Sequence, residues 1–167
     1  MRIRPASRQD LVEIALIHSA SWKEAYAGIL PADYLSDQVD QDLREHWEQQ
    51  KIQPGDVVLV AETGDGLLGF VAVWCRPNAF IDNLHVSQSV RSRGVGTELL
   101  RAAADRLIEL GHSTAYLWVF ESNADAIRFY ERLGAVRVGS AIKEIYGHAV
   151  PSVRMDWTDL GAMGVGV

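Results

Sequence analysis

Cysteine is nearly absent from this sequence, since Cys75 is the only one among 167 residues. A single thiol excludes an internal disulfide, and a thiolate metal cluster would need more ligands. Cys75 closes an apolar run that begins at Leu67, so we interpret it as a buried strand residue and not as a nucleophile. The five histidines show no ligand spacing. We interpret them as surface or packing residues and expect no metal.

Long apolar runs and an excess of basic residues are also missing. The sequence has no run of about 18 apolar residues, and its first residues lack the apolar segment of a signal peptide. We therefore predict a cytoplasmic protein without a membrane partner. The 22 acidic residues outnumber the 16 Lys and Arg, which argues against a nucleic-acid partner, because binding phosphates requires a basic surface. This charge is compatible with a cationic substrate, although soluble proteins often carry it without one.

What the chain does contain is typical of one globular domain, with 48% apolar and 23% charged residues. Periodicity and turn residues predict strands at 1–4, 56–62, 67–74, 79–86, 114–120, 135–144 and 150–157, and helices at 7–20, 21–28, 40–50, 94–110 and 123–133. This order predicts a mixed sheet flanked by helices in one α/β domain. We expect the domain to span residues 1–160, followed by a mobile tail without pattern at 161–167.

A glycine-containing loop joins the strand that ends at Val86 to the long helix. Gly94 and Gly96 lack a Cβ atom where a ligand would have to approach the backbone. The amides from Ser92 to Thr97 belong to the first turn of the helix, where N–H groups have no internal partner. Together with the helix dipole and the cations of Arg91 and Arg93, these amides favour a bound anion, for which a pyrophosphate is suitable.

Three kinds of glycine loop are candidates for this segment. A P-loop requires a lysine after Gly96, and none is present. A dinucleotide fingerprint requires a third glycine, where this sequence has Leu99. The pattern Arg/Gln-x-x-Gly-x-Gly does fit Arg91, Gly94 and Gly96, although motifs as short as this also occur by chance.

The segments on either side of the loop support the third of these patterns. Ile81-Asp-Asn-Leu-His-Val86 leads into it as a strand, and Asn123-Ala-Asp-Ala-Ile-Arg-Phe-Tyr-Glu-Arg-Leu-Gly134 opens the second helix after it. With these segments the chain resembles the GCN5-related N-acetyltransferase (GNAT) superfamily, in element order over nearly its whole length. The stretch 18–31 looks like one common bacterial branch. The resemblance implies a largely antiparallel sheet of about seven strands, flanked by helices and splayed between the fourth and fifth strands.

The same resemblance implies that the cofactor is acetyl-CoA, released as coenzyme A. Its pyrophosphate would bind the loop, and its pantetheine arm would pair with the main chain beside Leu84 and Val86. The implied cofactor-binding residues are Leu84, His85, Val86, Arg91, Ser92, Arg93, Gly94, Val95, Gly96, Thr97 and Asn123. For Asn123 the alternative is a plain helix N-cap, and both roles are compatible.

Tyr130 and Asp82 are the implied catalytic residues. Tyr130 matches the tyrosine near the thioester sulfur, and a phenol can lend a proton to the departing thiolate. The alternative for Tyr130 is packing of the helix. The attacking amine must lose a proton, and Asp82 is the first candidate for the base that takes it. Strand alternation places Asp82 on one face with Leu84 and Val86, although Asp82 could instead bind neighbouring backbone. Weaker candidates for the base are Glu144 and His148, while Glu24 could recognise a cation.

Trp22 and Tyr26 are one helical turn apart and are candidates for an aromatic wall around an amine, although such pairs are more often core. The resemblance thus implies acetyl transfer, through a tetrahedral intermediate, to a primary amine of a small molecule. Open alternatives are a protein or peptide acceptor and a non-catalytic CoA-binding regulatory module. An acceptor on charged tRNA is disfavoured by the acidic balance. Dimers are common among proteins that the chain resembles, so a homodimer is a further open point.

Overall fold

The computed structural model describes residues 1–145 and 147–164 and contains one seven-stranded sheet. Its strand order is β1-β2-β3-β4-β5-β7-β6, and β4 and β5 form the parallel pair in an otherwise antiparallel sheet. The strands are β1 (Arg2–Pro5), β2 (Val57–Thr63), β3 (Gly66–Cys75), β4 (Ala79–Val86), β5 (Ala115–Phe120), β6 (Val136–Ile145) and β7 (His148–Trp157). The α-helices are α1 (Leu11–Ala25), α2 (Val39–Gln49), α3 (Val95–Glu109) and α4 (Ala124–Arg132). None of the helices in this part of the chain is long and apolar enough to cross a membrane.

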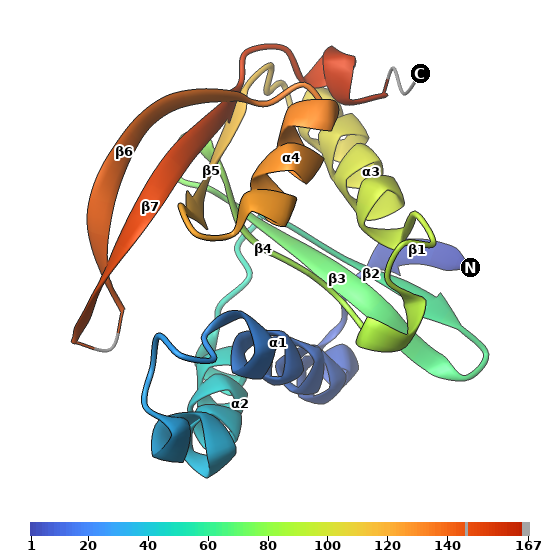
Figure 1. Cartoon of the computed structure of the whole chain (residues 1–167). Coiled ribbons are helices and arrows are strands. Elements are labelled where there is room, and N and C mark those ends of the chain that lie inside the picture. Colours follow the sequence, from blue (N-terminus) through green and yellow to red (C-terminus); the bar gives the residue numbers. More distant parts are fainter. Residues whose placement is uncertain (146, 165–167) are drawn as a thin grey trace.

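The helices cover the two faces of the sheet in pairs. Helices α3 and α4 lie on one face, and α1 and α2 lie on the other (Figure 1). Strand β2 shows why its sequence is continuously apolar: Val57, Leu59 and Ala61 join the core under α3, while Val58 and Val60 join the core under α1 and α2. A strand buried on both faces cannot alternate between apolar and polar residues. The predicted α/β domain with a mixed sheet of seven strands is therefore confirmed.

Strands β4 and β5 pair at a single register position, between Phe80 and Tyr116. Beyond it each strand keeps its other neighbour, since β4 pairs with β3 as far as Val86 and β5 pairs with β7 as far as Phe120. The two strands therefore diverge, and the predicted splay between the fourth and fifth strands is confirmed. Gly69 allows the close approach of β3 to β4 at this end, because a Cβ atom there would lie 2.7 Å from the carbonyl oxygen of His85.

A β-bulge interrupts β4 at Asp82. The pairing with β3 runs from Ala72–Asn83 directly to Val73–Ile81, so Asp82 is skipped. As a result Ile81 and Leu84, three residues apart, both pack on the core under α3. Simple alternation fails at such an extra residue. The prediction that Asp82 shares a face with Leu84 and Val86 is therefore wrong.

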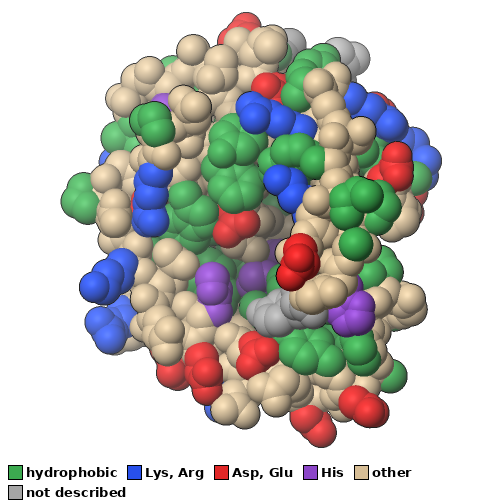
Figure 2. Space-filling view, turned by 90° about the vertical axis from the view of Figure 1, so that its left-hand side faces the viewer, with side chains coloured by type: hydrophobic (Ala, Val, Ile, Leu, Met, Phe, Trp, Pro, Cys, Tyr) green, Lys and Arg blue, Asp and Glu red, His purple; other side chains and the backbone are tan. Residues whose placement is uncertain are grey.

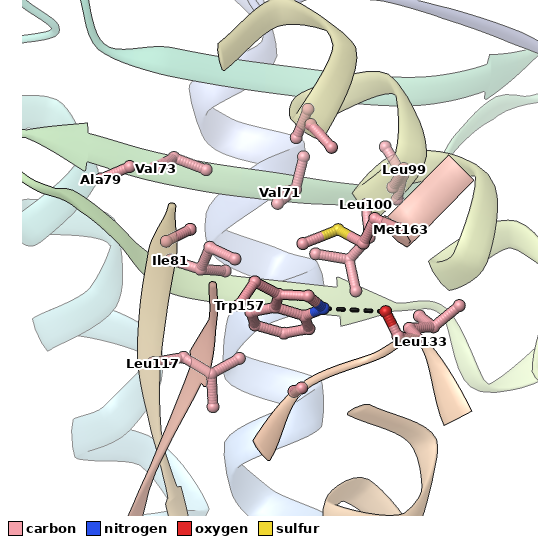
Figure 3. Close-up of a cluster of buried hydrophobic side chains, with 14 of the residues drawn as sticks. Val71, Val73, Ala79, Ile81, Leu99, Leu100, Leu117, Leu133, Trp157 and Met163 are labelled. Atoms are coloured by element: carbon pink, nitrogen blue, oxygen red, sulfur yellow. Dashed lines mark hydrogen bonds between the residues drawn. The ribbon is translucent and has the colours of Figure 1, made fainter. Parts of the chain in front are cut away.

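Two predicted boundaries also differ from the structure. Helix α1 continues to Ala25, so the predicted break at residue 20 is absent and Trp22 lies on the same helix as His18. At the other end, Leu160–Gly164 forms a short 3-10 helix whose Met163 is buried beside Leu99 and Leu100 (Figure 3). A mobile tail from Gly161 does not agree with this packing, because one apolar side chain anchors the segment. Residues 165–167 of the predicted tail lie outside the described residues.

Trp157 is the largest side chain at the centre of this core, and its one polar atom, the indole Nε1, needs a hydrogen-bond acceptor. Its indole Nε1 donates to the carbonyl oxygen of Leu133 at 2.9 Å, which ties β7 to the end of α4 (Figure 3). The side chain is 1% exposed.

We predict that Trp157→Phe lowers the free energy of unfolding by about 2–4 kcal/mol, because it leaves a cavity and removes the donor to a buried carbonyl. Urea unfolding measures this loss. Val138→Ala on β6 is the control, because Val138 is 52% exposed and such a change should stay within about 0.5 kcal/mol. Equal losses in the two variants would contradict the assignment of Trp157 to the core.

Candidate active site

A cleft of about 1420 Å³ opens where β4 and β5 diverge. It is lined by residues of α1, β4, the loop before α3, β5, α4 and β6. Figure 2 shows this side of the molecule, where acidic and histidine side chains gather around a hollow. The cleft therefore passes through the sheet and connects the side of α3 and α4 with the side of α1 and α2.

The loop before α3 turns backbone amides toward this cleft. Ser92 and Gly94 have left-handed backbones, with φ of 64° and 80°. For a residue with a side chain, such as Ser92, this conformation costs about 1–2 kcal/mol. In the described structure five backbone amides of this loop have no acceptor within the protein: those of Ser92, Gly94, Val95, Gly96 and Thr97. The amides of Arg91 and Arg93 differ, because each donates to a backbone carbonyl oxygen three residues earlier, at an N–O distance of 3.4 Å. Successive free amides of this kind form an anion-binding concavity.

Arg91 lies at the rim of this amide group but already has a partner. Its guanidinium donates to Oε1 of Glu24 on α1 at 2.6 Å, and this hydrogen bond lowers the pKa of Glu24. The pair joins the loop to the opposite side of the cleft. Glu24, considered from sequence as a site for a cation, is thus neutralised by Arg91. Arg93 is exposed and is not among the residues that line the cleft.

The main chain of β4 borders the cleft on its other side. Leu84 and Val86 lie past the last residue that pairs with β5, so their edge of the strand has no neighbouring strand. Gly96 packs above them, since a Cβ atom there would lie 3.6 Å from Val86 and 3.9 Å from Leu84. The loop amides and an open strand edge therefore form one continuous polar surface.

Comparison with known proteins identifies the family of chains that have this arrangement. The model of the acetyltransferase (GNAT) family matches residues 19–135. The chain belongs to this family. An uncharacterised N-acetyltransferase, YuaI of Bacillus subtilis, is 29% identical over 166 residues, which covers 96% of this chain and 95% of YuaI. These matches identify the chain as an acetyl-CoA-dependent N-acetyltransferase.

Solved structures agree on the fold of the acetyltransferase. A GCN5-related N-acetyltransferase from Rhodopseudomonas palustris superimposes with a TM-score of 0.75 at 21% identity, covering 93% of each chain. The PaiA N-acetyltransferase of Thermoplasma acidophilum, solved in complex with coenzyme A, gives a TM-score of 0.69 at 20% identity, covering 93% of this chain and 96% of that one.

Tyr130 and Asn123 reach the cleft of the acetyltransferase from α4. Asn123 caps this helix, because its Oδ1 accepts from the amide of Ala126 at 3.2 Å. The Tyr130 ring packs edge-on against Trp157, and within the described structure its hydroxyl has no hydrogen-bond partner. Burial raises the pKa of Tyr130 to about 12. The phenol therefore stays protonated throughout the neutral range and is available as a proton donor.

Asp82 lines the cleft from β4, on the side of α1 and not with Leu84. Its Oδ2 accepts from the indole Nε1 of Trp74 at 2.9 Å. The bulge thus turns the carboxylate toward the α1 side of the sheet, away from the loop amides.

The side chain of His85 also lies on the α1 side of the sheet. It stacks on His18 with ring centroids 4.5 Å apart, and Nδ1 of His18 accepts from the indole Nε1 of Trp47 at 3.0 Å. This bond leaves the Nε2 of neutral His18 as the proton-carrying nitrogen. Burial, followed by the nearby His85 and His46, lowers the pKa of His18 well below its usual value; burial and Arg91 lower the pKa of His85 to about 4.

His18 is 4% exposed, and with His46 and His85 it lines the cleft. Sequence analysis interpreted His18 and His46 only as surface or packing residues, and it placed His85 among the cofactor-binding residues. It also missed the aromatic wall of β5. Phe80 stacks on Tyr116, Lys143 lies over Trp118, and Phe120 meets Tyr26 at 4.6 Å. Alternation along β5 could have shown that Tyr116, Trp118 and Phe120 share one face.

The predicted pair Trp22 and Tyr26 does line the cleft, with ring centroids 4.7 Å apart. Tyr26 is buried together with Leu30 and Leu35, while Trp22 is partly exposed. Tyr26 therefore also has the packing role that sequence analysis considered as the alternative.

The buried His18 and the half-buried His85 predict a pH-dependent stability. In the unfolded chain a histidine binds its proton near pH 6.5, whereas in the folded acetyltransferase His85 does so near pH 4. Below pH 6.5 the unfolded state therefore binds more protons, and the free energy of unfolding falls by about 1.4 kcal/mol per pH unit for each such group. His85→Gln should reduce this slope between pH 6 and 4.5, measured by urea unfolding. An unchanged slope would contradict the lowered pKa of His85.

Proposed function

We propose that the enzyme transfers the acetyl group of acetyl-CoA to a primary amine of a small molecule. The observation that carries this proposal is the divergence of β4 and β5 beyond Phe80 and Tyr116, directly beside a loop with unpaired amides. An open strand edge can pair with an amide-bearing arm, and the loop amides can bind phosphate.

The residues of the cleft fit such a cofactor. The amides of Ser92 and of Gly94–Thr97 would hold the pyrophosphate, and the edge of β4 at Leu84 and Val86 would pair with the pantetheine arm. The capping hydrogen bond of Asn123 uses its Oδ1, and its Nδ2 group would face the same arm. Acetyl-CoA supplies an acetyl group activated as a thioester.

Tyr130 is the proposed proton donor. Its hydroxyl borders the cleft without a partner in the described structure, and its raised pKa keeps the proton in place until it is needed. Proton transfer to the departing sulfur turns a thiolate into a thiol, which is the better leaving group.

Asp82 is the proposed proton acceptor for the amine. It lines the cleft on the acceptor side, where Trp74 fixes one carboxylate oxygen and leaves Oδ1 without a partner in the described structure. The neutral His18 and His85 lie on the same side. They add no positive charge that would repel an ammonium ion.

A small acceptor is supported by the packing at one end of the cleft. Tyr26, Leu30 and Leu35 form a buried cluster that Phe120 of β5 and Ile145 of β6 pack against. The segment after α1 is thereby packed against both strands, and this contact restricts the space for an extended peptide at this end. A protein or peptide acceptor is the alternative that the panel below distinguishes.

The proposal is tested with purified protein, acetyl-CoA and a panel of polyamines, aminoglycosides, amino acids and short peptides. We expect calorimetry to detect acetyl-CoA binding, and thiol release to accompany acetylation of at least one small amine. A failure to bind acetyl-CoA at high micromolar concentration would overturn the cofactor assignment. Acetylation restricted to the peptides would overturn the small-molecule acceptor.

Tyr130→Phe should lower turnover roughly 100-fold, as expected for loss of a general acid. Because the pKa of Tyr130 is about 12, the loss should be uniform from pH 6 to 9 and leave the shape of the pH–rate profile unchanged. Tyr116→Phe is the matched control, since Tyr116 is not among the residues that line the cleft. Unchanged turnover of Tyr130→Phe, with chemistry rate-limiting, would assign Tyr130 to packing alone.

A further inference from the structure

Two side chains of opposite charge line the cleft from different strands and do not pair with each other. Asp82 comes from β4 and Lys143 from β6. Neither forms an ion pair with any described residue. Of the other basic side chains that line the cleft, Arg91 is paired with Glu24 and Arg128 with Asp125, whereas Arg132 on α4 also has no ion pair among the described residues. A charge left without a counter-ion in a ligand cleft is available to a ligand.

Lys143 is held in position by an aromatic ring. Its Nζ lies 3.8 Å from the centroid of the Trp118 ring, and the lysine side chain is only partly exposed. A ring below an ammonium ion attracts the charge but accepts few of its N–H donors. The donors that point away from the ring remain for an anion.

The register of the sheet places this cation opposite Asp82. Asp82 and Trp118 each lie two residues past the Phe80–Tyr116 pair, where β4 and β5 begin to diverge. Phe80 stacks on Tyr116 at 5.1 Å, so these rings share one face of the sheet. Trp118 follows Tyr116 on that face by alternation, and the bulge turns Asp82 toward it as well.

We propose that the acceptor is a zwitterion, a primary amine that also carries a carboxylate, and that Lys143 binds the carboxylate. This inference rests on the proposed function and names its substrate class. The amine end lies at Asp82, and the carboxylate end lies at Lys143 over Trp118. Arg132, also without an ion pair in the described structure, lies on α4 across the sheet from this wall.

A carboxylate fits this position better than a phosphate. Phosphate sites combine a bidentate arginine or a helix N-terminus with several donors. Lys143 on β6 offers one ammonium ion, whose charge a monoanion balances. The amides suited to phosphate lie at the loop before α3, on the cofactor side.

The experiment compares matched acceptors that differ only in this charge: β-alanine with β-alaninamide, and lysine with lysinamide. Thiol release from acetyl-CoA gives kcat/KM for each. For the natural chain we expect the carboxylate to be preferred by about 10- to 100-fold, the range for a charge-assisted hydrogen bond. Lys143→Met should abolish this preference by raising KM for the acids alone, and Lys143→Arg should retain most of it.

Three controls separate this role from others. Lys51→Met makes the same chemical change outside the cleft lining and should keep the preference. Asp82→Asn should slow both members of a pair and leave their ratio intact. Equal acetyl-CoA affinity of Lys143→Met and the natural chain, by calorimetry, shows that the fold and the cofactor site are preserved.

The possible results separate this inference from the proposed function. Equal use of acid and amide by the natural chain overturns the inference alone, as does an unchanged ratio in Lys143→Met. Acetylation of uncharged or polycationic amines, but of no amine that bears a carboxylate, also overturns the inference alone. If no amine of any kind gives thiol release, the proposed function is overturned, and this inference with it.

Discussion

The single backbone pairing between β4 and β5 is the constraint on which the rest of the site depends. Beyond Phe80 and Tyr116 the two strands are held apart, because each remains bonded to its other neighbour. Backbone groups at such an edge must find a partner or remain solvated. The fold therefore maintains an open polar edge in the middle of a sheet, where an added strand-like ligand can complete the pairing.

The sheet divides the chemistry between its two faces. On the side of α3 and α4, Ser92 and Gly94 adopt left-handed conformations that direct neighbouring amides into the cleft. On the side of α1 and α2, the rings of Trp22, Tyr26 and Trp118 line the cleft where we propose that the acceptor binds. The opening connects the two sides. The ion pair between Arg91 and Glu24 crosses it and ties the loop to α1.

The α1 side of the cleft, where we propose that the acceptor binds, combines neutral imidazoles with the unpaired charges of Asp82 and Lys143. Trp47 determines the tautomer of His18, and burial keeps both His18 and His85 uncharged at neutral pH. In the proposed mode of binding, Asp82 and Lys143 discriminate acceptors by charge. Each of these is held by an indole: Trp74 donates to Asp82, and the face of Trp118 lies below Lys143. Fixing the two groups reduces the entropy that a ligand would lose when it orders them.

Local pattern was sufficient for most of the fold. The periodicity of β2 through β4 and of α3 depends on neighbouring residues, and the glycine loop with Tyr130 and Asn123 lies in segments with recognisable spacing. The bulge at Asp82 was not predictable, because it depends on the register with Ala72 and Val73 of β3. The segment at Met163 was missed for a similar reason, since its anchor lies on α3, about 60 residues earlier in the chain.

The sequence by itself determined the order of elements, the family and the loop that precedes α3, because each of these depends on residues that are close together in the chain. Only the tertiary structure decided which face Asp82 occupies, that His18 is locked by Trp47, that Arg91 is paired with Glu24, and that Lys143 lies over Trp118. These contacts join residues that are 25 or more positions apart or lie in different strands. Their geometry follows from strand order and helix packing, which no local pattern contains.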